Sequence, residues 1–196
     1  MFFLRFCTVI IGLVMLAPFL AYSGTLDYPG VLAASTADML DSDKGVASPN
    51  TRFTNNGNGT ITDNLTGLIW LQNANVAGAR TWAEALTDVE NLNRDGTMNG
   101  TFAGDKSNGG SHQKDWRLPN RNELSSLTDS SNNNPALPSG YSSFFSGVQS
   151  DSYWSSDTLK GGIAYAWIVN MSDHGIMDTA HKTETCYAWP VRAGKE

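Results

Sequence analysis

The sequence has only two cysteines among its 196 residues, Cys7 and Cys186. Cys7 lies in an apolar run from Phe6 to Ala21, near the N-terminus. If that run is removed on export, Cys186 is the one cysteine left, and an internal disulfide is excluded. We therefore expect an apolar core to stabilise the fold, and the 173 residues after Ser23 are enough to build one.

Long apolar runs are also scarce, since no stretch beyond the N-terminal one is long enough to span a bilayer. That run follows Arg5, is interrupted by Pro18, and ends with small residues at Ala21 and Ser23. The pattern predicts a signal peptide over residues 1–23 that is cleaved on export. We expect the mature protein in the periplasm, at the cell surface or in the medium, and an uncleaved membrane anchor is the alternative.

Basic residues are few, with 13 Lys and Arg against 19 Asp and Glu and a net charge of −6. Removal of residues 1–23 takes away Arg5 and leaves a charge of −7. Binding to nucleic acid through bulk charge is therefore disfavoured. Lys114, Arg117 and Arg121 form a local basic cluster and are candidate binding residues, although such charges are commonly solvated or paired internally.

Aromatic residues are unevenly distributed along the chain. Residues 24–50 contain a single aromatic and two prolines, which is typical of a leader or spacer. All six tryptophans follow Thr51, and large buried rings are a main contribution to a packed core. We therefore expect one domain over residues 51–193.

Turn signals and short apolar runs predict β-structure at both ends of this domain. Segments 52–54 and 60–62 flank an Asn- and Gly-rich turn and predict a hairpin, and residues 68–71 predict a buried strand. Residues 153–156, 164–170 and 186–191 are predicted strands, with a turn at 173–175.

Two capping boxes, Thr81 with Glu84 and Asn120 with Glu123, predict two helices. The first has apolar residues at helical spacing and ends near Gly96. The second is shorter and directs Leu124 inward. The Gly-rich segment 96–110 and the Asn- and Pro-rich segment 129–140 predict exposed loops, which are candidates for presenting binding groups. Helices beside antiparallel strands indicate an α+β fold.

Five segments in this order resemble the Lcl C-terminal domain family, named after the end domain of a collagen-like bacterial adhesin. The resemblance covers about residues 51–192 and rests on 57–64, 66–70, 115–124, 153–156 and 189–192. Within these segments the following residues are interpreted as structural motif positions: Trp70, Trp116, Arg117, Leu118, Pro119, Glu123, Trp154 and Arg192.

The resemblance implies a C-type-lectin-like domain with two helices packed on antiparallel β-structure, an architecture shared with formylglycine-generating enzymes. It also implies binding of a glycan or a surface protein, because the adhesin that names the family binds sulfated polysaccharide. The sequence departs from that adhesin in its negative charge and in having no collagen-like Gly-x-y repeat.

Strand alternation around residues 116–119 predicts that Trp116 and Leu118 point inward and that Arg117 points to the opposite side. Arg117 is then free to contact a ligand. The competing structural hypothesis is a partly buried ion pair of Glu123 with either Arg117 or Arg192.

No metal and no cofactor are expected. Asn56, Asn58 and Gly59 are spaced as in a calcium loop, but the end positions Thr54 and Leu65 lack carboxylates, so a plain hairpin is favoured. The three histidines also lack the i, i+4 spacing of a helical metal pair.

No catalytic residue is expected either. A formylglycine-generating type of enzyme needs a cysteine pair, and a Cys–His nucleophile would have to combine Cys186 with His112, His174 or His181. A buried small side chain is the default role of Cys186. The leading hypothesis is an exported, non-enzymatic binding or adhesion module, followed by a structural envelope protein and last by an enzyme.

Overall fold

The computed structural model describes residues 51–194, and the structural statements below concern that part of the chain. The predicted signal peptide and the predicted spacer fall outside it. The described part has two α-helices and eleven strands that form three sheets, which confirms the α+β class. No helix within it is both long and apolar enough to cross a membrane.

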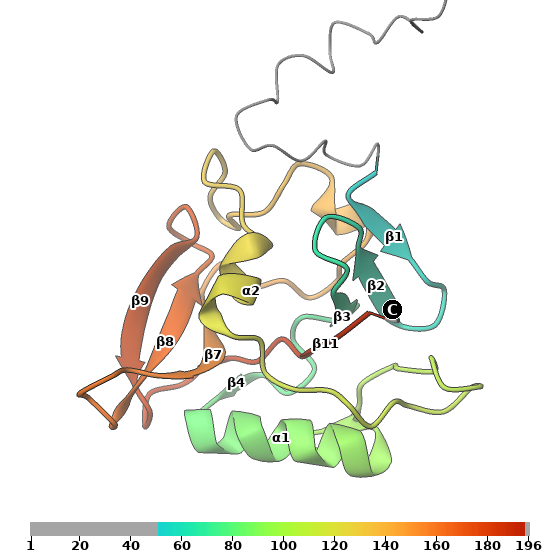
Figure 1. Ribbon diagram of the computed structural model, residues 1–196, viewed down its shortest axis with the longest axis horizontal. Coiled ribbons are helices and arrows are strands. Elements are labelled where there is room, and N and C mark those ends of the chain that lie inside the picture. Colours follow the sequence, from blue (N-terminus) through green and yellow to red (C-terminus); the bar gives the residue numbers. More distant parts are fainter. Residues whose placement is uncertain (1–50, 195–196) are drawn as a thin grey trace, which may run out of the picture. The chain divides into compact units, whose positions relative to one another are not determined.

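The first sheet joins the two ends of the described chain. Its strand order is β1-β2-β3-β11, and all neighbours are antiparallel. The hairpin of β1 and β2 and the buried strand β3 confirm the predictions from turn signals, while β11 pairs with β3 (Figure 1). The strands are β1 (Phe53–Asn55), β2 (Thr60–Asp63), β3 (Ile69–Leu71) and β11 (Val191–Arg192).

The second sheet has the order β4-β10-β7-β8-β9, and its one parallel pair is β10 with β7. The predicted turn at 173–175 is confirmed, with positive φ at His174 and Gly175. The strands β4 and β9 were not predicted. The bounds are β4 (Ala79–Arg80), β7 (Ser152–Thr158), β8 (Tyr165–Asn170), β9 (Ile176–His181) and β10 (Cys186–Tyr187).

The prediction of one strand over residues 186–191 is wrong. The chain leaves β10 of the second sheet after Tyr187 and enters β11 of the first sheet at Val191. Pro190 lies between the two strands and has no backbone N–H to donate to a neighbouring strand. Its carbonyl still accepts a hydrogen bond from the amide of Leu71. The Trp189 region therefore connects the two sheets instead of extending either one.

Both predicted helices are confirmed together with their caps. Helix α1 (Trp82–Asp95) begins at Thr81, whose side chain accepts the Glu84 amide, and ends at Gly96 with φ 79°. Helix α2 (Arg121–Ser126) begins at Asn120, whose side chain accepts the Glu123 amide. Of the apolar stripe on α1, Ala85, Val89 and Leu92 are buried, whereas Trp82 and Leu86 are partly buried against the core.

The prediction that residues 96–110 form one exposed loop is wrong in its first half. The hairpin of β5 (Thr97–Met98) and β6 (Thr101–Phe102) lies there, with Met98 fully buried. Its two-residue turn is Asn99-Gly100, with φ angles of 47° and 72°. Asn-Gly is a strong short-range hairpin signal because both residues tolerate positive φ, and the local sequence therefore contained the information.

The second half of the same segment is fixed by the carboxylate of Asp105, which is fully buried. It accepts the amides of Ser107 and Gln113 and the indole N–H of Trp116, at 2.8 Å each. Burial by itself would raise the pKa of Asp105, but these hydrogen bonds outweigh it and the pKa is lowered. The loop is thus tied to the core.

The tryptophan content predicted a packed core, and Trp189 is a central residue of it. Its ring contacts those of Trp70, Phe145 and Tyr153, with centroid distances of 5.7, 4.9 and 5.6 Å. Its indole N–H donates to the Leu71 carbonyl at 2.8 Å. Trp189 therefore binds the first sheet and the second sheet into one apolar core.

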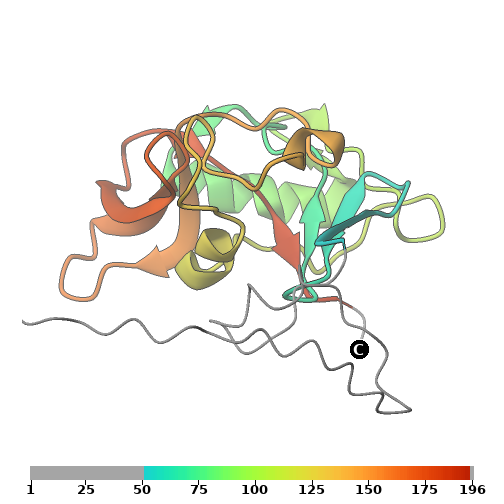
Figure 2. The same ribbon diagram turned by 90° about the horizontal axis from the view of Figure 1, so that it is seen from above.

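Helix α2 lies between the two sheets in both views, where it contacts β7, β8 and β9 (Figures 1 and 2). Helix α1 contacts β4 and β5 instead. This arrangement places the N-terminal end of α2 next to the C-terminal end of β7 and next to β8.

Candidate functional site

The three basic candidates from the sequence do not converge on one cavity. Arg121 lines a groove beside α2, Arg117 is held by Glu123, and the exposed Lys114 lines neither this groove nor the second cavity described below. The basic cluster is therefore divided between an internal ion pair and one open site. That site is the best candidate for function.

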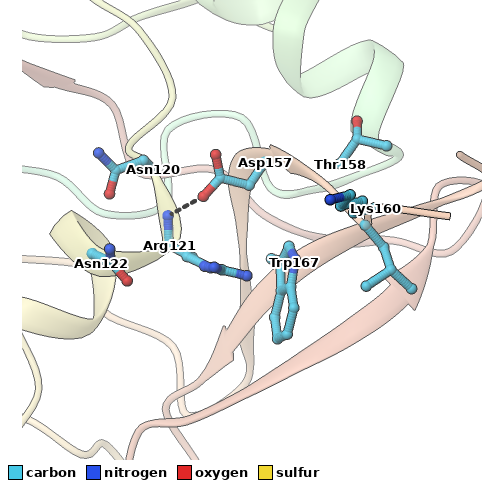
Figure 3. Close-up of a pocket in the computed structure, with 8 residues that line it drawn as sticks. Asn120, Arg121, Asn122, Asp157, Thr158, Lys160 and Trp167 are labelled. Atoms are coloured by element: carbon cyan, nitrogen blue, oxygen red, sulfur yellow. Dashed lines mark hydrogen bonds between the residues drawn. The ribbon is translucent and has the colours of Figure 1, made fainter. Parts of the chain in front are cut away.

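The groove, which we call the α2 groove, has a volume of about 430 Å³. It lies between the start of α2, the end of β7, the turn after β7 and the middle of β8 (Figure 3). Neither predicted binding loop, 96–110 or 129–140, contributes to it. Its lining residues are Asn120, Arg121, Asn122, Asp157, Thr158, Leu159, Lys160 and Trp167.

Arg121 and Trp167 form the central pair of the α2 groove. The guanidinium carbon of Arg121 lies 4.4 Å from the centroid of the indole, and Figure 3 shows the side chain extending toward the ring. This is a cation–π arrangement. Every other arginine within residues 51–194 is paired with a carboxylate, whereas Arg121 has no ion pair in that range. Its positive charge is therefore available to a ligand.

The start of α2 is held by two carboxylates. Asp157 accepts the backbone N–H of Arg121 at 2.9 Å, the bond drawn in Figure 3. Glu123 accepts the backbone N–H of Asn120 at 2.8 Å. The carboxylates of Asp157 and Glu123 thus occupy the positions at the start of α2 that an external anion could take.

The expected ion pair of Glu123 with Arg117 is present, and the alternative partner Arg192 pairs with Asp115 instead. Two Arg117 nitrogens contact the two Glu123 oxygens at 2.7 Å each. Burial would raise the pKa of Glu123, but the hydrogen bonds from Arg117 and Asn120 lower it below its ordinary value. Trp116 and Leu118 point inward as expected, while Arg117 is largely exposed.

An aromatic row continues from the α2 groove along β8. Tyr165 and Trp167 are two residues apart on one strand, so they share a face of the sheet. Tyr165 is 42% exposed and packs edge-on against His181 of β9, with ring centroids 5.2 Å apart. The groove and the row together give one face that combines aromatic rings with polar groups.

The structure does not assemble the Cys–His pair that the sequence left open. Cys186 is buried in β10, and that burial raises its pKa to about 12. His181 lies on β9, three strands from β10 and hence about 14 Å away at the usual strand spacing. No hydrogen bond joins Cys186 to a histidine within residues 51–194. A thiol with a raised pKa is a poor nucleophile.

The hairpin that resembled a calcium loop uses its own polar groups. The side-chain oxygen of Asn58 accepts the amide and the hydroxyl of Thr60, at 3.2 and 2.7 Å. Asn56 likewise exchanges hydrogen bonds with Thr62. No group of three or more His, Cys, Asp or Glu side chains that could hold a metal occurs in the described part of the chain.

Sequence reasoning missed Asp157, Lys160 and Trp167 as residues of the α2 groove. Trp167 carried a weak signal, since an aromatic residue at an alternating strand position has an even chance of facing outward. Nothing in the sequence indicated that residues 157–167 meet the start of α2, because that contact joins segments more than 30 residues apart.

Comparison with models of protein families identifies a family for this chain. The family model described as Lcl C-terminal domain matches residues 59–192, and therefore covers all of the α2 groove and most of both sheets. No curated protein matches the chain at a significant level.

Proposed function

Because the chain belongs to the Lcl C-terminal domain family, we propose that it is a non-enzymatic binding or adhesion module whose ligand-binding surface is the α2 groove. The proposed ligand is a glycan on a surface partner. Small-ligand sites are concave and combine aromatic side chains with a few polar groups that fix the orientation of the ligand. The α2 groove contains one aromatic ring and a larger share of polar groups, which suits a ligand rich in hydroxyls.

The observation that carries the proposal is the Arg121–Trp167 pair in an open cavity. Sugars present apolar C–H faces that pack against aromatic rings and hydroxyls that require hydrogen-bond partners. Trp167 and the neighbouring Tyr165 supply the rings. Asn122, Asp157 and Arg121 supply amide, carboxylate and guanidinium groups for the hydroxyls.

We further propose that the fold is C-type-lectin-like and that the protein is exported. The first is supported by two helices on mainly antiparallel sheets and by the pairing of β11 with β3, which brings the ends of the domain into one sheet. Superposition of an experimental structure on C-type lectin domains tests it, and unrelated strand connections would reject it. Export is supported by the apolar run after Arg5.

The test of the α2 groove is a glycan array probed with the full chain and with Trp167→Ala and Arg121→Ala. We expect the chain to bind a subset of glycans and each variant to bind about tenfold more weakly, because a stacked cation and ring contribute on the order of 1 to 2 kcal/mol. Affinities for the glycans selected on the array are then measured by calorimetry.

Matched controls are Phe102→Ala and Arg94→Ala, which remove an exposed ring and an exposed guanidinium outside the groove. Both controls should bind as the unchanged chain does. If the chain captures no glycan, or if the groove variants bind like the controls, the proposal is wrong and the structural envelope protein becomes the leading hypothesis.

A further inference from the structure

A second cavity, of about 390 Å³, lies on the outer face of the first sheet, away from the α2 groove. Its floor is formed by side chains of β2, β3 and β11, and one wall is the tip of the β1–β2 hairpin. Ser107 and Gln113, from the segment that Asp105 ties to the core, also line the cavity. We call it the Arg192 pocket.

Strand register explains why Arg192 reaches this cavity. Thr62, Ile69 and Arg192 are direct cross-strand partners on β2, β3 and β11. Directly paired residues project to the same face of a sheet. The three side chains therefore form one row, with the guanidinium at its end.

Arg192 is a buried cation with unused donors. It is 7% exposed, and its Nε donates to Asp115 at 2.8 Å. Its two terminal nitrogens make no hydrogen bond within residues 51–194 and belong to a side chain that lines the pocket. A guanidinium has five N–H donors, of which the Nε–H alone is used within the described residues. The remaining donors are available to an acceptor in the pocket, either water or a ligand.

The rest of the pocket lining is uncharged, and apart from Ile69 its side chains are polar. Asn58 uses its side-chain oxygen within the hairpin, which leaves its amide nitrogen without a partner in the described residues. Gln113 donates its amide nitrogen to the Ser107 carbonyl, which leaves its oxygen. Both side chains line the cavity and offer one donor and one acceptor for hydroxyl groups.

Charge limits the kind of acceptor. Asp115 compensates Arg192 at 2.8 Å, and no second cation lines the pocket. A doubly charged phosphate would be poorly balanced there, whereas a singly charged carboxylate is planar and matches the fork of a guanidinium. The surrounding amides and hydroxyls suit a carboxylate that carries neighbouring hydroxyl groups.

We propose that the Arg192 pocket binds the carboxylate of a small sugar acid, with Arg192 as its ion partner and with Asn58 and Gln113 as partners of its hydroxyls. This site is separate from the α2 groove, and the proposal does not depend on glycan binding there. Cyclic uronic acids and open-chain aldonic acids share the required chemistry.

The test is calorimetric titration of the full chain with glucuronate and gluconate, which separate the cyclic from the open-chain source. Glucose, inorganic sulfate and inorganic phosphate are the comparison ligands. We expect at least one sugar acid to bind about tenfold or more tightly than glucose, because glucose has no carboxylate to accept charged hydrogen bonds from Arg192. Sulfate or phosphate binding as tightly as the sugar acids would overturn the proposal.

Variants separate binding from folding. Arg192→Ala removes a buried side chain from the first sheet and is expected to destabilise the fold. The main variant is therefore Thr62→Phe, which fills the floor of the pocket and leaves the Arg192–Asp115 pair in place. We expect it to lose sugar-acid binding by about tenfold or more while it melts cooperatively.

Thr54→Phe is the matched control, because Thr54 pairs with Thr62 on the same face but does not line the pocket. It should bind like the unchanged chain, as should Arg121→Ala in the α2 groove. Unchanged sugar-acid affinity in a folded Thr62→Phe variant would reject the assignment to this pocket.

Discussion

The carboxylate of Glu123 shows how one side chain connects local and tertiary structure. It closes the capping box of α2 through the Asn120 amide and accepts two hydrogen bonds from Arg117 at 2.7 Å. The Glu123 side chain is 18% exposed, but that of Arg117 is 45% exposed. Solvent therefore screens the pair, and its contribution lies below the 3 to 5 kcal/mol typical of breaking a fully buried pair.

We expect Glu123→Gln to lower the free energy of unfolding by about 1 to 2 kcal/mol, because the variant keeps an acceptor but loses the charge. For a domain of this size the melting temperature falls by roughly 2 to 4 °C per kcal/mol. Glu90→Gln is the control, since Glu90 is exposed on α1 without an ion pair in the described residues. An unchanged melting temperature for Glu123→Gln would contradict the role given to the pair.

The same difference should depend on pH. The folded pKa of Glu123 lies below its ordinary value, so its stabilisation is fully present above about pH 4.3 and is lost as the pH falls through the folded pKa. Denaturant unfolding of the unchanged chain and of Glu123→Gln, at pH 7 and near pH 3, measures this difference in the free energy of unfolding, which should shrink at the lower pH. A difference of equal size at the two pH values would exclude the charge of Glu123 as its cause.

At the scale of elements, the tip of the β1–β2 hairpin packs against the Gly-rich segment after α1. The Asn58 carbonyl accepts the amide of Lys106, and a Cβ placed on Gly59 would collide with the carbonyl of Gly104. Gly59 therefore has two requirements, a φ of 82° and the absence of a side chain. Gly57, two residues earlier, has a similar φ of 71° but open space around it.

This pair of glycines gives a matched prediction. Gly57→Ala should cost about 1 kcal/mol through its positive φ alone. Gly59→Ala should cost about 1 to 3 kcal/mol more, because two backbone segments must separate to admit the methyl group. Denaturant unfolding of both variants measures the difference, and equal destabilisation would show that the contact with Gly104 carries no weight.

At the scale of the whole molecule, the two sheets are held together by the rings around Trp189 and by the return of β11 to β3. Cys186 adds no disulfide and is a buried thiol. Stability therefore rests on apolar burial and on charged groups that are tied down individually, such as Asp105, Glu123 and Arg192.

Export is a prediction for the whole chain. The apolar run interrupted by Pro18 and the small residues Ala21 and Ser23 predict cleavage ahead of Gly24. N-terminal sequencing of the protein from a host that exports it should therefore give a sequence that begins at Gly24. A chain that still begins at Met1 would support the uncleaved anchor.

The sequence by itself determined those features whose hydrogen bonds close within a few residues. The two capping boxes, the hairpin at 53–63 and the turn at 173–175 are set by such local bonds, and the Asn99-Gly100 hairpin was equally available from its sequence. Family membership also followed from the order of short motifs.

Only the tertiary structure decided which distant groups meet. Glu123 forms its ion pair with Arg117 and not with Arg192, and residues 186–191 are divided between two sheets. Arg121 contacts Trp167, which lies 46 positions further along the chain. These outcomes depend on how the apolar faces of separate elements pack together. The periodicity of a single element does not determine which other element it packs against. The two cavities are consequences of this packing, which is why single motifs did not reveal them.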